Sequence, residues 1–319
     1  MPQVTITSSG MADLVHIASA RGATYADART VEREHEAVSV KDGAVESVTR
    51  TADRGLAFRV IHKGAWGFAS TDRTEDSATR GLVDEAFRRA EASASVQRRT
   101  VKLAPVPPQK GEYRTTLDRD PFAVPLAERI DHLRAVDAAS VGPNIKTRRS
   151  SVAAYRTRKH LVTSEGTDVS QEIVEAGAGL SVLAVKAGRK PAGRYDSRLV
   201  RQGGWEYVEH LDLVARAARY RDDAEATLDA PLAVERPTTL VFAPEFLALL
   251  VHESCGHPTE ADRLLEHEVA FAGTTFMWPE DRGKLRYGST QVSMTADATL
   301  PGGMGTFGWD DDGEPAMRT

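Results

Sequence analysis

The sequence of 319 residues contains a single cysteine, Cys255, so it cannot form an intramolecular disulfide and fits a reducing compartment. Aromatic residues are few, at 6%, and aliphatic side chains must therefore fill most of the core. No hydrophobic run approaches the roughly 20 residues needed to span a bilayer. The N-terminus also lacks the basic and then apolar segments of a secretory signal. We therefore expect a cytoplasmic protein that makes no membrane contact.

Positive charge is not in excess, because 41 Lys and Arg residues face 46 Asp and Glu residues, for a net charge of −5. This balance gives no electrostatic reason to expect nucleic acid or an anionic membrane as a partner. Arginines cluster only locally, at Arg148-Arg149 and between Arg156 and Lys159. We interpret these clusters as solvated strand faces.

The composition, 41% hydrophobic and 27% charged, is that of an ordinary globular protein, and the length allows two domains. Apolar spacing and turn residues predict the order of elements in the first 230 residues. The predicted elements are a helix at 12–20, hairpins turning at Asp42-Gly43 and Lys63-Gly64, a helix at 75–92, a Pro-rich connection at 101–112, a helix at 125–139, β-rich chain at 145–185 and a helix at 205–228.

The character of the chain changes after Pro237. Residues 238–242 predict a short buried strand, and Pro244 suits the first turn of a helix. That helix is apolar nearly all round and is expected to lie in a core, whereas the last 60 or so residues are Gly-rich and aperiodic. We predict an α+β protein with an N-terminal α/β domain at 1–230, a sub-boundary near 101–112, and the first part of a second domain at 231–319.

The chemically distinctive stretch is His252-Glu253-Ser254-Cys255-Gly256-His257. A zinc hydrolase needs imidazole ligands and a nearby carboxylate to take a proton from water. His252 and His257 are the candidate ligands, and Glu253 is the candidate general base. Positions five apart, however, lie about 140° apart around a regular α-helix, and their side chains could not share one metal ion.

The residues around the second histidine indicate that the helix is not regular at this point. Gly256 precedes His257 and Pro258 follows it, and neither favours an undisturbed α-helix. The sequence therefore predicts that the helix ends or widens into a π-type turn, whose backbone bonds are five residues apart. The alternative is a pair of core histidines beside a capping glutamate.

The motif and its context resemble the TldD/PmbA family, described as modulators of DNA gyrase and as metallopeptidases. The stretch that carries the likeness most strongly is 249–262, LLVHESCGHPTEAD. Further segments match in order: 25–29 (YADAR), 40–43 (VKDG), 53–60 (DRGLAFRV), 64–70 (GAWGFAS) and 307–316 (FGWDDDGEPA).

The resemblance implies an α/β N-terminal domain, a β-rich C-terminal domain and a dimer that encloses the active site. TldD-type chains carry the His-Glu-x-x-x-His motif, and PmbA-type (TldE) partners lack it, so this chain is similar to the TldD type. By the resemblance, His252 and His257 bind Zn²⁺ and Glu253 activates water. The implied partners are unfolded or extended peptides as substrates and either a second copy or a PmbA/TldE-like subunit.

One departure concerns the third metal ligand, which in this family is a cysteine far downstream of the motif. No cysteine follows Cys255, and we expect the sequence to be a fragment that lacks about 100–150 further residues of the second domain. Cys255 and Glu260 are possible stand-ins, although Glu260 is better interpreted as an acid that orients a ligand or faces substrate. His267 is expected to be an exposed helix residue, and Asp310, Asp311 and Asp312 a solvated turn.

A direct action on gyrase or DNA, which the historical name of the family suggests, is disfavoured by the net negative charge, and two other functions remain open. The first is a zinc peptidase in which Glu253 activates water. The second is a catalytically incomplete partner or binding subunit of a TldD/PmbA-like dimer.

Overall fold

A computed structural model describes residues 8–73 and 76–319. The chain forms two compact units, one made of Met1–Ala230 with Ala296–Thr319 and the other of Pro231–Thr295. Within the described ranges, no helix combines the length and the apolar character that a membrane crossing requires.

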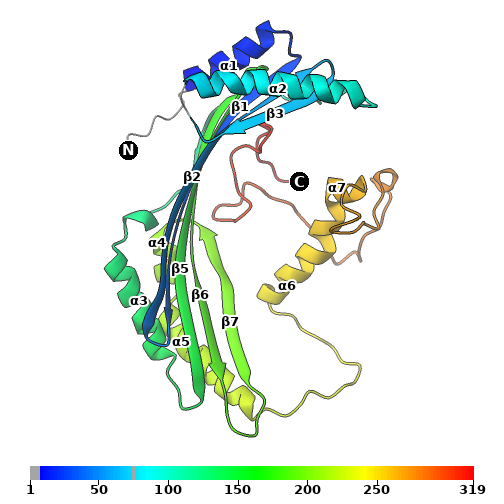
Figure 1. Cartoon of the computed structure of the whole chain (residues 1–319). Helices are drawn as coiled ribbons and strands as arrows, with labels where there is room; N and C mark the ends of the chain where they lie inside the picture. The colour runs from blue at the N-terminus through cyan, green and yellow to red at the C-terminus, as the bar shows by residue number, and fades with distance from the viewer. Residues whose placement is uncertain (1–7, 74–75) are drawn as a thin grey trace. The chain divides into compact units, whose positions relative to one another are not determined.

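The first unit is built on one long sheet of seven strands (Figure 1). Its strands are β1 (Tyr25–Lys41), β2 (Ala44–His62), β3 (Ala65–Thr71), β4 (Lys110–Arg114), β5 (Ile145–Thr163), β6 (Asp168–Ala184) and β7 (Ala192–Gln202). The order is β3-β2-β1-β5-β6-β4, and β7 also pairs with β6. Only β4 runs parallel to its neighbour, whereas the other pairs are antiparallel.

Both predicted hairpins are confirmed, with the turns at the predicted residues. Asp42 and Gly43 have φ angles of 49° and 84°, and Lys63 and Gly64 have φ angles of 52° and 76°. Positive φ at both central residues is the type I′ pattern, whose twist matches that of the flanking strands. These turns fix the β1–β2 and β2–β3 registers.

The predicted helices of this unit are confirmed, with one correction. They are α1 (Ser8–Ala20), α2 (Asp76–Val96), α3 (Leu126–Ala139), α4 (Trp205–His210) and α5 (Leu213–Leu228). The single helix expected over 205–228 is broken because Asp212 adopts a left-handed conformation, with φ at 44°. Its carboxylate then accepts a hydrogen bond from the backbone N–H of Ala215 and caps α5.

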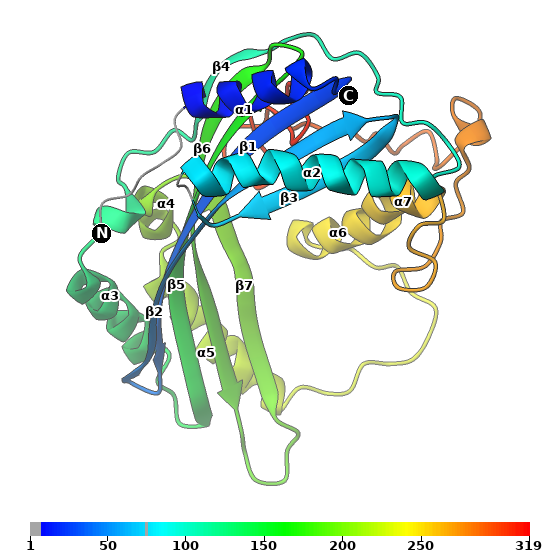
Figure 2. The same cartoon turned by 45° about the horizontal axis from the view of Figure 1, so that its top comes forward.

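All five helices pack on the same face of the sheet, where they form two large hydrophobic cores and a smaller one that joins α5 to β6 and β7 (Figures 1 and 2). Ala26 and Ala28 of β1 lie under α1 and α2, and Val38 and Val40 lie under the α3–α5 group. The same face carries Glu32, Glu34 and Glu36 between the two cores, because alternate residues of a strand share one face. The clustered arginines of β5 form ion pairs and are not simply solvated, for example Arg158 with Glu34 at 2.8 Å and Arg156 with Asp120 at 2.6 Å.

On the opposite face, the C-terminal segment Ala296–Thr319 lies against the end of the sheet that α1 and α2 cover from the other side (Figure 1). Asp311 accepts from Lys159 at 3.0 Å, and Asp312 accepts from Arg59 at 2.7 Å. The acidic turn is largely exposed, as expected, with 63% and 66% of these two side chains accessible. Its ion pairs to the sheet were not predicted.

The second unit contains α6 (Pro244–Val251), the π-helical turn η2 (His252–Gly256), η3 (His257–Thr259), α7 (Ala261–Leu264) and η4 (Pro279–Asp281). The helix from Pro244 is confirmed, but its expected burial is wrong, because Phe246 is 48% exposed and Val251 47%. The strand expected at 238–242 is also wrong, and Val241 there is 95% exposed. Both predictions required apolar neighbours on all sides, which the unit Pro231–Thr295 does not supply.

The range 231–319, which the structure describes throughout, contains isolated bridges between Asp297 and Arg318 and between Trp309 and Pro315, but no strand ladder. The predicted α+β fold class is confirmed by the seven-stranded sheet and its helices, and residues 231–319 add only these two bridges to it.

Candidate functional site

The His-Glu-x-x-x-His motif lies on a π-helical turn, His252–Gly256, that continues α6. The backbone N–H of His257 donates to the carbonyl oxygen of His252, which is the five-residue bond of a π turn. As a result the two imidazole rings lie on the same side, with centroids 4.4 Å apart and planes inclined at 68°. The predicted widening of the helix is confirmed.

Gly256 has an ordinary right-handed conformation, with φ −67° and ψ −65°. A Cβ built on it would meet the nearest atom, His252 Nδ1, at 3.9 Å, which is an ordinary contact. The turn therefore does not depend on the conformational freedom of glycine, contrary to the role expected from the sequence. Pro258, which is buried and has no N–H to continue the helical bonds, directly follows the turn.

His252, Glu253 and His257 bring one potential ligand atom each into a cluster in which these atoms lie within 4.8 Å of one another. The Glu253 carboxylate is 3.9 Å from His257 Nε2. A π turn explains this arrangement because a wider turn brings both the fourth and the fifth residue back to the same side. Two imidazoles and a carboxylate are donors that a divalent metal of the zinc type accepts.

Glu260 contacts the His257 imidazole at Nδ1, the nitrogen that does not face Glu253. Its carboxylate lies 2.8 Å from His257 Nδ1 and accepts from Arg263 Nε at 2.6 Å. These two hydrogen bonds, first that from His257, lower the pKa of Glu260 below its ordinary value. Nδ1 also lies 3.1 Å from Arg263 Nη2. With Nδ1 engaged by Glu260 and Arg263, Nε2 is the nitrogen left to face Glu253 and a metal ion.

The other candidates from the sequence lie apart from this cluster. The thiol of Cys255 forms a hydrogen bond with Tyr287 and is not one of the three clustered donors. His267 is exposed, as expected, but it lies in a turn and not in a helix. A second group of acids, Glu260, Asp262 and Glu268, also lies within 4.8 Å, and desolvation together with Asp262 raises the pKa of Glu268.

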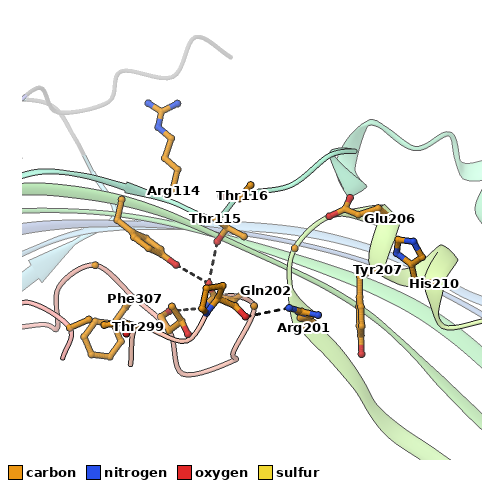
Figure 3. Close-up of a pocket in the computed structure, with 17 residues that line it drawn as sticks. Arg114, Thr115, Thr116, Arg201, Gln202, Glu206, Tyr207, His210, Thr299 and Phe307 are labelled. Atoms are coloured by element: carbon orange, nitrogen blue, oxygen red, sulfur yellow. Dashed lines mark hydrogen bonds between the residues drawn. The ribbon is translucent and has the colours of Figure 1, made fainter. Parts of the chain in front are cut away.

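A cavity of about 590 Å³ lies in the first unit where the end of β4, the end of β7 and the C-terminal segment meet (Figure 3). Its central side chain is Gln202, which accepts from the hydroxyls of Tyr113 and Thr115 and donates to the carbonyl oxygen of Thr306. Figure 3 shows Thr115 directed at Gln202 and Arg114 extending away from it. These bonds join strands to the C-terminal segment.

The acid of this cavity, Glu206, is also engaged. Burial alone would raise its pKa, but hydrogen bonds from the backbone N–H groups of Gly204 and Arg119 lower it below the ordinary value. A carboxylate held ionised in this way is poorly suited to general acid–base chemistry at neutral pH. We therefore interpret this cavity as a place where hydrogen bonds hold the strands and the C-terminal segment together, and not as a catalytic site.

Comparison with solved structures first identifies the fold, which this chain shares with three proteins. A structure of a protein described as a modulator of DNA gyrase, BT3649 from Bacteroides thetaiotaomicron, superimposes with a TM-score of 0.74 at 15% identity, covering 99% of this chain and 70% of that one. TM0727 from Thermotoga maritima, similarly described, gives 0.72 at 14% identity, with coverage of 98% and 68%. TldE from Thermococcus kodakarensis gives 0.63 at 16%, with coverage of 97% and 66%.

Sequence profiles then identify the family. Those described as PmbA/TldA metallopeptidase domain 1, central domain and C-terminal domain match residues 26–94, 119–221 and 235–319. The chain belongs to the PmbA/TldD metallopeptidase family, and the resemblance seen in the sequence is confirmed.

Curated relatives carry the name metalloprotease. Metalloprotease MJ0996 of Methanocaldococcus jannaschii is 24% identical over 92% of this chain and 63% of its own length. Metalloprotease slr0863 of Synechocystis is 28% identical over 93% of this chain and 61% of its own length. The chain therefore spans less than two thirds of the length of these relatives.

Proposed function

We propose that this chain is the TldD-type subunit of a zinc-dependent metallopeptidase that hydrolyses unfolded or extended peptides. The observation that carries the proposal is the π turn, because it gathers His252, Glu253 and His257 into one donor cluster. The names of the relatives support a metallopeptidase. A cytoplasmic location is part of the proposal and rests on the single cysteine and the composition.

Each residue of the cluster has a distinct role in this proposal. His252 and His257 hold the metal through ring nitrogens, and Glu260 fixes the tautomer and orientation of His257 through Nδ1. Zinc held there would supply a Lewis acid that lowers the pKa of water and polarises a peptide carbonyl. The Glu253 carboxylate accepts the proton of the attacking water and then passes it to the leaving amine.

The ligand set is incomplete in the described cluster, since catalytic zinc sites use three protein ligands and Glu253 is kept as the base. We propose that the third ligand comes from outside the described cluster. The exposed apolar helix α6 supports a further proposal, a homodimer or a heterodimer with a PmbA/TldE-like subunit.

The second candidate is a binding subunit without catalytic activity, favoured by the same shortage of ligands in the cluster. Metal content and turnover separate the two. Protein purified without chelator is analysed for zinc and assayed on an unfolded peptide, with His252→Ala and Glu253→Gln as variants. The peptidase predicts about one zinc per chain, loss of zinc in H252A, and loss of turnover with retained zinc in E253Q. Absence of zinc at neutral pH, or unchanged cleavage by E253Q, contradicts it.

A further inference from the structure

The face of the sheet opposite the helices contains a second cavity, of about 560 Å³, bounded by β1, β5, β6 and the segment from Met304 to Asp312. Strand residues on its wall include Arg33, Thr157, Ile173 and Glu175, which all point to the side not covered by helices because they share one strand face. Phe307 and Trp309 of the C-terminal segment form its apolar side.

Glu175 is the unusual residue of this wall. It is only partly exposed, and within residues 8–73 and 76–319 its carboxylate has no hydrogen-bond or ion-pair partner. Desolvation by burial raises the pKa of this carboxyl. A half-buried carboxylate without a partner is unfavourable, and a cation brought in by a ligand removes that cost.

The neighbours of Glu175 suit an organic cation. Tyr155 is its direct cross-strand neighbour, so the two Cβ atoms lie about 5 Å apart. Tyr155 lies beside the lining of the cavity and is 44% exposed, and its ring stacks on His35 of the next strand, with centroids 4.3 Å apart and planes inclined at 13°. A carboxylate beside an exposed aromatic face is the combination that recognises an ammonium group.

Arg33 supplies the opposite charge at the far side of the same wall. It is exposed and, in the described part of the chain, forms no ion pair, not even with its cross-strand neighbour Asp53, whereas Lys159 of the cavity is paired with Asp311.

Arg33 on β1 pairs with Thr157 on β5, which pairs with Ile173 on β6. Glu175 lies two residues further along β6, so two strand spacings and a two-residue step separate it from Arg33. Strand spacing and rise put the two Cα atoms about 12 Å apart, close to the span of four extended residues.

We propose that this cavity binds a short zwitterionic peptide, with its α-ammonium group at Glu175 and Tyr155 and its α-carboxylate at Arg33. The choice of a peptide rests on the proposed peptidase function. The binding itself does not, because no group of the metal cluster takes part.

Calorimetry on metal-free protein tests the proposal with tetra-alanine as the probe. Tetra-alanine is expected to bind at least tenfold more tightly than its N-acetyl form and than its C-terminal amide. Glu175→Gln is expected to abolish the difference between free and acetylated peptide, and Arg33→Gln the difference between acid and amide. Glu172→Gln, on the same strand but on the other face, is the matched control and should preserve both differences.

Two further measurements distinguish recognition of the peptide termini from attraction of any cation. N-acetyl-Lys-Ala-Ala-Ala carries its ammonium group on a side chain, and binding as tight as that of tetra-alanine contradicts recognition of the amino terminus. Equal binding of free and acetylated tetra-alanine, or unchanged discrimination in E175Q or R33Q, also overturns the proposal. His252→Ala is expected to bind tetra-alanine like the unmodified protein. The peptide-binding proposal can therefore hold if the peptidase proposal fails, and the peptidase proposal can hold if peptide binding at Glu175 and Arg33 is not found.

Discussion

The backbone N–H of His257 donates to the carbonyl oxygen of His252, and this bond turns a spacing unsuited to a shared metal into a suitable one. On a regular α-helix, residues five apart point about 140° away from each other. Here the ring centroids are 4.4 Å apart. The proposed metal site therefore depends on this one π turn.

Replacing Gly256 with alanine is expected to be tolerated. Its φ of −67° suits any residue, and the added Cβ meets His252 Nδ1 at 3.9 Å. Zinc content should remain within a few per cent of the unmodified protein, and helix propensity should improve by about 1 kcal/mol. Zinc analysis checks this, with H257A as the variant that must lose metal. Loss of metal in G256A would show that the turn needs glycine.

Glu260→Gln is expected to weaken zinc binding by about 10–100-fold, since it removes the carboxylate that orients His257. Competition with a chromogenic chelator measures the affinity. Asp262→Asn is the matched control, because Asp262 is exposed and has no contact with His257 among the described hydrogen bonds and ion pairs. Equal affinities for the two variants would remove Glu260 from the site.

The two ion pairs of Arg59 are expected to differ in their contribution to stability. Asp27 is 2% exposed and accepts from Arg59 at 2.7 Å, whereas Asp312 is 66% exposed. Arg59→Met removes both pairs, leaves the buried Asp27 carboxylate with its Tyr25 hydrogen bond but without its ion pair, and should cost about 3–5 kcal/mol. Asp312→Asn removes a surface pair and should cost less than about 1 kcal/mol. Urea unfolding measures both, and similar costs would contradict this division.

Glu175→Gln is expected to raise the melting temperature at neutral pH. The folded-state pKa of this carboxyl is raised above its ordinary value of 4.5 by desolvation. The folded state therefore binds the proton more tightly, and stability falls as pH rises from 4.5 through the folded-state pKa. The gain of E175Q should be complete above that pKa and vanish below pH 4.5. Thermal unfolding at several pH values measures it, and a gain independent of pH would exclude an ionised carboxylate as the cause.

The same substitution is predicted to stabilise the protein and to remove discrimination between free and acetylated peptide. A gain in stability together with a loss of binding selectivity is typical of substitutions in binding sites, where groups are kept for function at a cost in stability. A variant that is less stable but still discriminates would contradict both predictions at once.

Local structure was predictable where a few neighbouring residues decide it. Asp42-Gly43 and Lys63-Gly64 adopt positive φ angles and set two hairpins whatever packs around them. Proline at 244 and at 258 marks the beginning of α6 and the end of the π turn. The break at Asp212 was not predicted, because the apolar spacing continues through it, although Asp is favoured at helix N-caps and tolerates the left-handed conformation.

The candidate site divides in the same way. His252, Glu253 and His257 were found from residue type and spacing, and Glu260 from its position after the motif. The contacts of Glu260 with both His257 and Arg263 required the fold of residues 257–263. The place of Glu175 in a cavity wall could not be predicted, because strand alternation tells which residues share a face but not which face the helices leave uncovered.

The sequence by itself determined the hairpin turns, most helices and the widened turn at the histidines, because these depend on backbone preferences of adjacent residues. Only the tertiary structure decided that the acidic turn at Asp311 and Asp312 pairs with Lys159 and Arg59, that α6 stays exposed, and that Glu175 lacks a partner among the residues the structure describes. Burial and charge pairing depend on what lies next to a side chain in space, and residues more than 100 positions apart meet there only after the sheet has formed.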